Sequence, residues 1–264
     1  MINSSQNKFV RETRRVSDRR DRSEKFIVEG LKNAVEIADA QFKIHWILYS
    51  AAVTGKPEFN RLITGLNARK IPCFPVADRV LSGISDVETS QGLILVAEKP
   101  EWKTGEIFAG SDLLVLLDSI QDPGNLGTII RTSEAAGVDA VLLTRGSVDP
   151  FNRKAVRATA GSILRLPVLQ DQGNEEILRL KKSGFTVVAV HSRAEQAYND
   201  FDYPPKIIFI FGSEGSGISD GIMKLADSSI GIPVKPGVDS LNVAVAAGII
   251  LFEAARRLTG KKIC

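Results

Sequence analysis

Residues 113–132 read LLVLLDSIQDPGNLGTIIRT, and the order of residue types in this stretch decides the fold class. The first five residues are apolar, which predicts a β-strand buried on both faces rather than one with a face in water. Asp122-Pro123-Gly124-Asn125 then predicts a turn. The helix expected after this turn carries Arg131 on its second turn. A buried strand, a turn and a helix in this order are typical of an α/β protein.

Four more apolar runs follow towards the C-terminus, each flanked by segments of helical character. Such strands alternating with helices indicate a parallel sheet that is covered on both faces. Open sheets of this kind bind ligands at the carboxyl ends of their strands, so that edge is where we expect a site. The four strands are Ala140–Leu143, Thr186–Val190, Ile207–Phe211 and Ile230–Val234.

The chain before residue 99 predicts a second, smaller α/β unit. Lys99–Glu106 combines proline, glycine and charges without periodicity, which is typical of a linker between compact units. We therefore expect a first domain at 1–98, a linker at 99–111 and a second domain at 112–264. Within the first domain, the pattern predicts strands at 26–30, 44–49, 71–76 and 93–96 and helices at 31–38 and 62–69.

Charge is unevenly distributed along the chain. The 264 residues include 34 Lys and Arg against 31 Asp and Glu, and a net charge of +3 does not by itself indicate a polyanionic partner. Residues 8–25, however, hold eight basic and four acidic side chains, a local excess of +4 (8 − 4). This segment is consistent with a solvated helix face and equally with a surface that contacts RNA phosphates.

Cysteine and histidine are scarce. Cys73 and Cys264 provide no disulfide framework, which favours a reducing cytoplasmic setting. His45 and His191 lack the spacing of metal ligands, so we expect structural or surface roles for both and no metal. No apolar stretch reaches membrane-spanning length, and the charged N-terminus has no apolar run behind it. The sequence therefore indicates neither a transmembrane helix nor a signal peptide.

Three segments place small or polar residues at the end of an expected strand, and each has a plain structural interpretation. The first is consistent with a turn followed by a solvated arginine. The glycines around Glu214 are consistent with a strand that turns into a helix. Ser240 or Asp239 is consistent with an N-cap of the last helix. The three segments are 117–132, 209–219 and 232–248.

Taken together and in this order, the three segments resemble the motifs of the SpoU (TrmH) branch of the SPOUT methyltransferases. The first resembles D-P-x-N-x-G-x-x-x-R-T, the second F-G-x-E-G-x-G-[LI]-S, and the third I-P-M-x-G-x-x-x-S-L-N, over residues 113–258. The sequence departs from the pattern in two places: Ser213 stands where asparagine is common, and Val234-Lys235 stand where methionine and a small residue are common. Weaker similarity at Phe26–Gly30 and Ser90–Leu93 resembles the L30e-like substrate-binding domain of two-domain members.

The resemblance implies a fold, a cofactor and an assembly. It implies a C-terminal SPOUT domain that contains a trefoil knot, although general fold rules make knots very rare. It also implies that S-adenosylmethionine binds in the knotted region and that a homodimer brings Arg131 towards this pocket. The expected cofactor-binding residues are Gly212, Gly217, Ile232, Ser240 and Leu241.

The activity implied by the resemblance is methyl transfer to an RNA ribose 2′-hydroxyl, with Arg131 as the principal catalytic residue. A guanidinium with a pKa above about 12 is a poor base near neutral pH, so we expect Arg131 to stabilise developing negative charge on the ribose oxygen. Glu214 is a candidate to orient Arg131 through a charge-assisted hydrogen bond. The complete expected catalytic set is Arg131, Asn125, Glu214, Ser240 and Asn242.

Three alternatives to a ribosomal RNA methyltransferase are considered, and two of them stay open. A Rossmann-type oxidoreductase is disfavoured, because Asp220 stands where the third glycine of G-x-G-x-x-G belongs. A transfer RNA substrate is an alternative to ribosomal RNA, which the extra N-terminal domain favours only by analogy. A non-catalytic, dimeric RNA-binding protein is the third possibility, although the presence of Arg131, Glu214 and Asn242 together argues for an enzyme.

Overall fold

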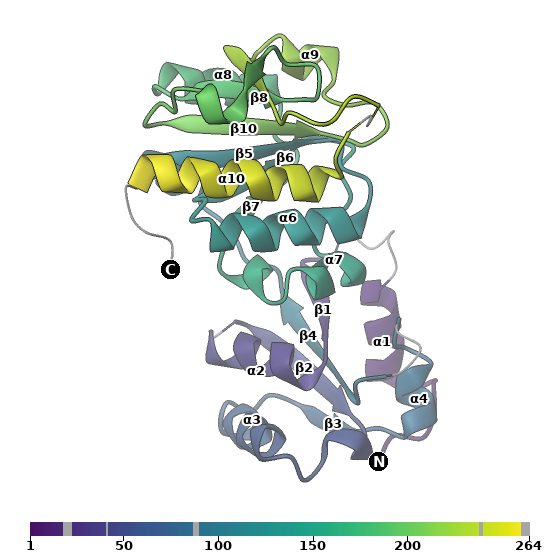
Figure 1. The fold of residues 1–264 in the computed structure, drawn as a ribbon. Helices are drawn as coiled ribbons and strands as arrows, with labels where there is room; N and C mark the ends of the chain where they lie inside the picture. Colours follow the sequence, from purple (N-terminus) through teal and green to yellow (C-terminus); the bar gives the residue numbers. More distant parts are fainter. Residues whose placement is uncertain (18–22, 41, 87–89, 238–239, 260–264) are drawn as a thin grey trace. The chain divides into compact units, whose positions relative to one another are not determined.

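The computed structural model describes the chain except for residues 18–22, 41, 87–89, 238–239 and 260–264. The chain divides into two compact units, each with its own sheet (Figure 1). Unit 1 comprises Met1–Glu101 and Phe151–Leu164, and unit 2 comprises Trp102–Pro150 and Arg165–Cys264. The chain therefore passes between the units three times. The predicted α/β class is confirmed, whereas the trefoil knot stays a prediction.

Unit 1 is built on a four-stranded mixed sheet of order β1-β4-β2-β3. β4 pairs antiparallel with both β1 and β2, while β3 pairs parallel with β2. The predicted strands and helices of this unit are present, most with changes of one or two residues at their ends, but the helix predicted at 62–69 begins five residues earlier, at Pro57. Its strands are β1 (Lys25–Glu29), β2 (Ile44–Tyr49), β3 (Cys73–Pro75) and β4 (Leu93–Glu98), and its helices are α1 (Lys8–Ser17), α2 (Leu31–Asp39), α3 (Pro57–Ala68), α4 (Asp78–Ser82) and α7 (Arg153–Ala158).

The described first part of the basic N-terminal segment forms helix α1, which packs on the sheet of unit 1, whereas Arg19, Arg20 and Arg22 lie outside the described residues. Val10 and Thr13 are fully buried, and the Thr13 hydroxyl oxygen accepts a hydrogen bond from Trp46 Nε1 at 3.0 Å. Arg11 and Arg15 are exposed on the same helix. The segment is thus an amphipathic helix whose apolar side is fixed to the fold and whose outer side carries the charge.

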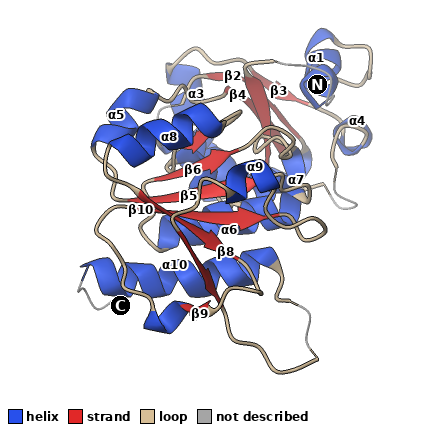
Figure 2. Cartoon of the chain, turned by 90° about the horizontal axis from the view of Figure 1, so that it is seen from above, coloured by secondary structure: helices blue, strands red, loops and turns tan. Residues whose placement is uncertain are grey.

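Unit 2 contains a seven-stranded, all-parallel sheet of order β7-β6-β5-β10-β8-β11-β9. Figure 2 shows β6, β5, β10 and β8 side by side in this order. All six residues of β5 are buried, as the apolar run predicts. Its strands are β5 (Leu113–Asp118), β6 (Ala140–Leu143), β7 (Val168–Leu169), β8 (Thr186–Val190), β9 (Gln196–Ala197), β10 (Ile207–Gly212) and β11 (Ser228–Gly231).

Helices cover both faces of this sheet. In Figure 1, α6 and α10 lie on one face and α8 and α9 on the other. Side chains of α5, α8 and α9 join alternate residues of the strands in one apolar core. The segment expected as a linker contains α5. The helices of unit 2 are α5 (Thr104–Ala109), α6 (Pro123–Ala135), α8 (Asn174–Lys182), α9 (Asp220–Met223) and α10 (Val243–Thr259).

Helix α6 begins earlier than the turn chemistry predicts. The Asp122 carboxylate accepts a hydrogen bond from Asn125 N at 2.8 Å and caps the helix, and Pro123 occupies its first position. Asn125 therefore lies in the first turn of α6 rather than before it. Arg131, the ninth residue of α6, lies on the third turn and not on the second, so this detail of the prediction was wrong.

Helix α10 is capped by Asn242. Its side-chain oxygen accepts hydrogen bonds from Ala244 N at 2.9 Å and Val245 N at 3.3 Å. The suggestion that Ser240 serves as this N-cap was therefore wrong, because the helix starts two residues later than that cap requires; Asp239 lies outside the described residues. Among the helices that the structure describes, none is long and apolar enough to cross a membrane.

Candidate active site

The first two motif segments meet at one edge of the parallel sheet. β5 and β10 are neighbours, with Asp118 opposite Gly212, and both strands end there. The residues that follow each strand must therefore lie close together, as expected for the carboxyl edge of an α/β sheet. The third segment leads from β11 into α10, which packs beside α6 (Figure 1).

Asn125, Glu214 and Asn242, one from each motif, form a hydrogen-bonded cluster. Glu214 Oε1 accepts from Asn125 Nδ2 at 2.8 Å and from Asn242 Nδ2 at 2.6 Å. Asn242 Nδ2 also lies 3.1 Å from Asn125 Oδ1. Asn242 holds this position because the same side chain caps α10. The fold thus brings together three side chains that are up to 117 positions apart in sequence.

Arg131 does not join this cluster. It is exposed on α6, and none of the hydrogen bonds or ion pairs among the described residues involves it. The proposed hydrogen bond between Arg131 and Glu214 is not seen among the described residues of the single chain, in which Glu214 Oε1 accepts from two amide donors. Within a single chain, the expected catalytic residues are therefore divided among the asparagine–glutamate cluster, Ser240 in the lining of the neighbouring cavity and a separate arginine.

A cavity of about 530 Å³ lies beside the cluster, at the ends of β8 and β10. Glu214 lines it, together with apolar side chains such as Met223 and Val234. Its size falls in the range of small-molecule sites, which are largely apolar with a few placed polar groups. All five residues expected to bind the cofactor line this one cavity: Gly212, Gly217, Ile232, Ser240 and Leu241.

A tight turn at Ser213–Gly217 shapes one wall of the cavity. Ser213 N donates to Gly217 O at 3.1 Å, and Gly217 N donates to Ser213 O at 2.9 Å. A Cβ atom on Gly212 would lie 2.1 Å from the carbonyl carbon of Gly217, and Gly217 itself has φ +68°. Both positions therefore require glycine. The hydroxyl of Ser213, where related sequences commonly have asparagine, accepts from Ser216 N at 3.2 Å and stabilises the same turn.

The sequence model of the SpoU rRNA Methylase family matches residues 112–252, more than half of the chain. The chain belongs to this family. Its N-terminal part, residues 7–95, matches the MRM3-like substrate binding domain. The family match covers all three motif segments up to the middle of α10, and the second match covers the sheet of unit 1 except the end of β4.

Relatives of this SpoU family member match over nearly its whole length. An uncharacterized tRNA/rRNA methyltransferase of Synechocystis is 33% identical over 97% of this chain and 93% of the relative. The 23S rRNA (guanosine(2553)-2′-O)-methyltransferase RlmP of Bacillus subtilis is 31% identical over 96% of this chain and 98% of its own. The structure of an AdoMet-bound rRNA methyltransferase from Sinorhizobium meliloti superposes with a TM-score of 0.86, at 31% identity over 97% of each chain.

In this SpoU family protein, His191 lines the cavity, although the sequence suggested a structural or surface role. It directly follows β8, and its backbone N–H donates to Ile230 O at 3.1 Å. Partial burial and the nearby Arg193 guanidinium lower the pKa of His191. The only available sequence signal was its place at the end of an apolar strand, which is the same signal that marks the other site residues.

Asp118 is a second residue whose importance the sequence did not reveal. Its side chain is almost fully buried at the end of β5, where Oδ2 accepts from Ser219 N at 2.7 Å and Oδ1 accepts from the Thr144 hydroxyl at 2.8 Å. Asp118 thereby links the first motif segment to the end of the second. A charged residue that closes an apolar strand is the pattern that could have indicated this role.

Proposed function

We propose that this SpoU family protein transfers a methyl group from S-adenosylmethionine to a ribose 2′-hydroxyl of ribosomal RNA. The observation that carries the proposal is the convergence of the three motifs: Asn125, Glu214 and Asn242 join at the rim of one ligand-sized cavity. Two relatives support it, since one is an AdoMet-bound rRNA methyltransferase and the other is a 23S rRNA (guanosine(2553)-2′-O)-methyltransferase.

The lining of the cavity fits S-adenosylmethionine. Ile232 and Leu241 offer an apolar surface of the kind that receives an adenine ring, while Gly212 and Gly217 let the turn at Ser213–Gly217 close tightly along one wall. Ser240 and Glu214 add polar groups to the same lining. When bound, the cofactor supplies an electrophilic methyl group, and the protein has to position an RNA oxygen in line with it.

The role of Arg131 in this scheme is electrostatic. Its guanidinium stays charged at neutral pH and can stabilise the negative charge that develops on the ribose oxygen and contact an adjacent phosphate. Asn125 and Asn242 are held by Glu214 with their amides fixed, which suits them to position the ribose or the chain around it. Ser240 lines the cavity beside them as a further hydrogen-bonding group.

We also propose that the active form is a homodimer. Arg131 and Asn125 are not among the residues that line the cavity, so a second copy of the chain is the proposed means of bringing Arg131 to it. Val245 and Phe252 on α10 are 53% and 39% exposed, which is unusual for large apolar side chains on a helix that packs in the fold. This apolar strip is the proposed contact surface.

Methyl transfer from labelled S-adenosylmethionine tests the proposed function directly. The purified protein should label unmethylated ribosomal RNA, and mapping of 2′-O-methylation should locate one ribose. Labelling of transfer RNA instead would identify transfer RNA as the substrate. Binding of RNA without methyl transfer would favour the non-catalytic alternative. The cytoplasm, where ribosomal RNA is available and cysteines stay reduced, is the proposed location.

A further inference from the structure

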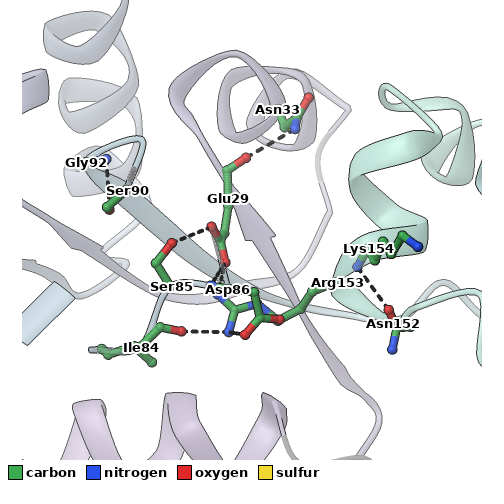
Figure 3. Close-up of polar contacts among 10 residues, drawn as sticks. All are labelled: Glu29, Asn33, Ile84, Ser85, Asp86, Ser90, Gly92, Asn152, Arg153 and Lys154. Atoms are coloured by element: carbon green, nitrogen blue, oxygen red, sulfur yellow. Dashed lines mark hydrogen bonds and ion pairs between the residues drawn. The ribbon is translucent and has the colours of Figure 1, made fainter. Parts of the chain in front are cut away.

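Arg153 forms a buried ion network at the start of α7, within unit 1 (Figure 3). Only 7% of this side chain is exposed. Its guanidinium forms an ion pair with Glu29, and Nη1 donates to the Ile84 carbonyl at 2.6 Å and to Asp86 Oδ1 at 3.1 Å. One side chain thus joins α7 to the end of β1 and to the segment after α4.

Glu29 is equally well held on its side of the network. Its carboxylate accepts hydrogen bonds from the Ser85 hydroxyl at 3.0 Å and from Asp86 N at 3.3 Å (Figure 3). Its side chain is 3% exposed. Asn33 Nδ2 donates to the Glu29 carbonyl at 3.1 Å and fixes the backbone at the same point. Removing Arg153 would leave a buried carboxylate without its cation, which is among the most costly single changes in a protein.

Arg153 keeps its charge within this network. Burial and the nearby Arg157 guanidinium lower the pKa of Arg153 to about 10, and the group is still charged at neutral pH. An aromatic contact adds to the attachment of the same segment, because the rings of Phe26 and Phe151 meet edge to face at 5.1 Å. The start of α7 is therefore fixed to β1 by one buried ion network and one ring contact.

The partners in this network come from different parts of the sequence. Arg153 lies in the range that matches the SpoU family, whereas Glu29 and Asp86 lie in the range that matches the substrate binding domain. Segment 151–164 belongs to unit 1 by its contacts, and the chain leaves unit 2 before it and returns to unit 2 after it. Unit 1 is thus attached to unit 2 at both ends of this segment as well as at residue 101.

We propose that Arg153 is a positioning residue for RNA methylation, because its buried network fixes segment 151–164 of the methyltransferase sequence inside the substrate-binding unit. The inference rests on the proposed function. Both ends of this segment continue into the unit that carries the proposed methyl-donor cavity, so a shift of α7 against β1 would change how the RNA-holding unit is attached to that unit. Arg153 touches neither RNA nor cofactor in this role.

Arg153→Met in the full chain tests the proposal, with in vitro transcribed, unmethylated 23S ribosomal RNA as substrate. We expect KM for this RNA to rise about ten-fold with kcat within about two-fold of wild type. The affinity for S-adenosylmethionine, measured by calorimetry, should not change. Backbone hydrogen exchange in residues 153–158 should accelerate, and Arg153→Lys should recover part of the loss because an ammonium can satisfy some of the acceptors.

Arg61→Met is the matched control. Arg61 also lies in unit 1 and pairs with Asp39 at 3.9 Å, but both side chains are 70% exposed, so this variant should behave as wild type. If Arg153→Met does not fold, Asp86→Ala removes a partner that is 53% exposed and should raise KM about two- to three-fold in a folded protein.

The outcomes separate the two proposals. A wild-type protein that does not methylate the RNA contradicts the proposed function. An active wild-type protein together with folded variants of Arg153 and Asp86 that keep the wild-type KM contradicts only the positioning role. A parallel loss of kcat and of cofactor affinity, in proportion to the unfolded fraction, also overturns it, because that result indicates a merely structural contribution.

Discussion

At the scale of single residues, Asn242 has two separate tasks. Its side-chain oxygen caps α10, and its amide nitrogen donates to Glu214. The helix cap and the proposed role in methyl transfer therefore depend on different atoms of one side chain. Substitutions that keep one atom and lose the other can separate the two contributions.

Asn242→Ala should lower both stability and methyl transfer. The loss of the cap costs about 0.5–2 kcal/mol in the free energy of unfolding. Asn242→Ser keeps an oxygen that can cap the helix but has no amide to reach Glu214, so it should unfold near the wild-type temperature and still be poorly active. Thermal unfolding and labelled methyl transfer measure the two effects, and an active Asn242→Ser protein would show that the bond to Glu214 is dispensable.

Arg131→Ala should leave the fold and cofactor affinity intact, since Arg131 is exposed and does not line the cavity. Methyl transfer should fall by about 10²–10³ in kcat, the usual loss for one group that stabilises a developing oxyanion. Arg131→Lys should also fail, because an ammonium does not reproduce the planar guanidinium. Near-normal turnover in either variant, measured at saturating cofactor, would remove Arg131 from the catalytic set.

Leu241→Arg should abolish binding of S-adenosylmethionine by placing a charge in the apolar wall of the cavity. Wild-type protein should unfold at a higher temperature when the cofactor is present, and the variant should show no such increase. Leu178→Arg is a suitable control, because Leu178 is 44% exposed on α8, away from the cavity lining. Calorimetry that finds wild-type affinity in folded Leu241→Arg would contradict the cofactor assignment.

At the scale of elements, the apolar runs predicted most strands because a buried parallel strand needs apolar residues at every position. β5, β8 and β10 are present where expected. The two-residue strands β7 and β9 were missed, since so short a segment has no periodicity to detect. The last expected strand, 230–234, is shifted to Ser228–Gly231, because Pro233 cannot donate a ladder hydrogen bond and two serines join the strand instead.

Glu253 should stabilise α10 in a pH-dependent way. Hydrogen bonds from the Arg256 and Arg257 guanidinium groups lower its pKa from 4.5 to about 2. A lowered folded-state pKa means that the stabilisation is complete above the unfolded-state value and is lost as pH falls through about 2. Glu253→Gln should therefore unfold about 2–4 °C lower than wild type at pH 7, and the difference should shrink below about pH 4.5. A difference that does not depend on pH would contradict this.

At the scale of the whole molecule, the sequence predicted two α/β units but not how the chain is shared between them. Nothing in the sequence of Phe151–Leu164 indicates that this segment packs in unit 1, because its contact partners Phe26 and Glu29 lie more than a hundred positions earlier in the chain. The cluster of Asn125, Glu214 and Asn242 could be anticipated only through the family motifs. Turn and cap chemistry alone would have predicted only local structural roles for these residues.

The proposed homodimer is tested by replacing exposed apolar residues of α10. Val245→Asp or Phe252→Asp should give a monomeric mass in sedimentation at micromolar concentration, because a charge in an apolar contact is costly. Methyl transfer should fall with dimer content if Arg131 acts across the contact. A wild-type monomer with full activity would contradict both the assembly and the shared site.

The discontinuous make-up of unit 1 has a consequence for synthesis on the ribosome. Arg153 emerges 124 residues (153 − 29) after Glu29, with which it forms a buried ion pair. At a synthesis rate of about 5–20 residues per second, Arg153 is added about 6–25 s after Glu29. A domain cannot complete its folding before its last segment has been synthesised. The substrate-binding unit therefore reaches its final state only after β5, α6 and β6 of the other unit have been synthesised.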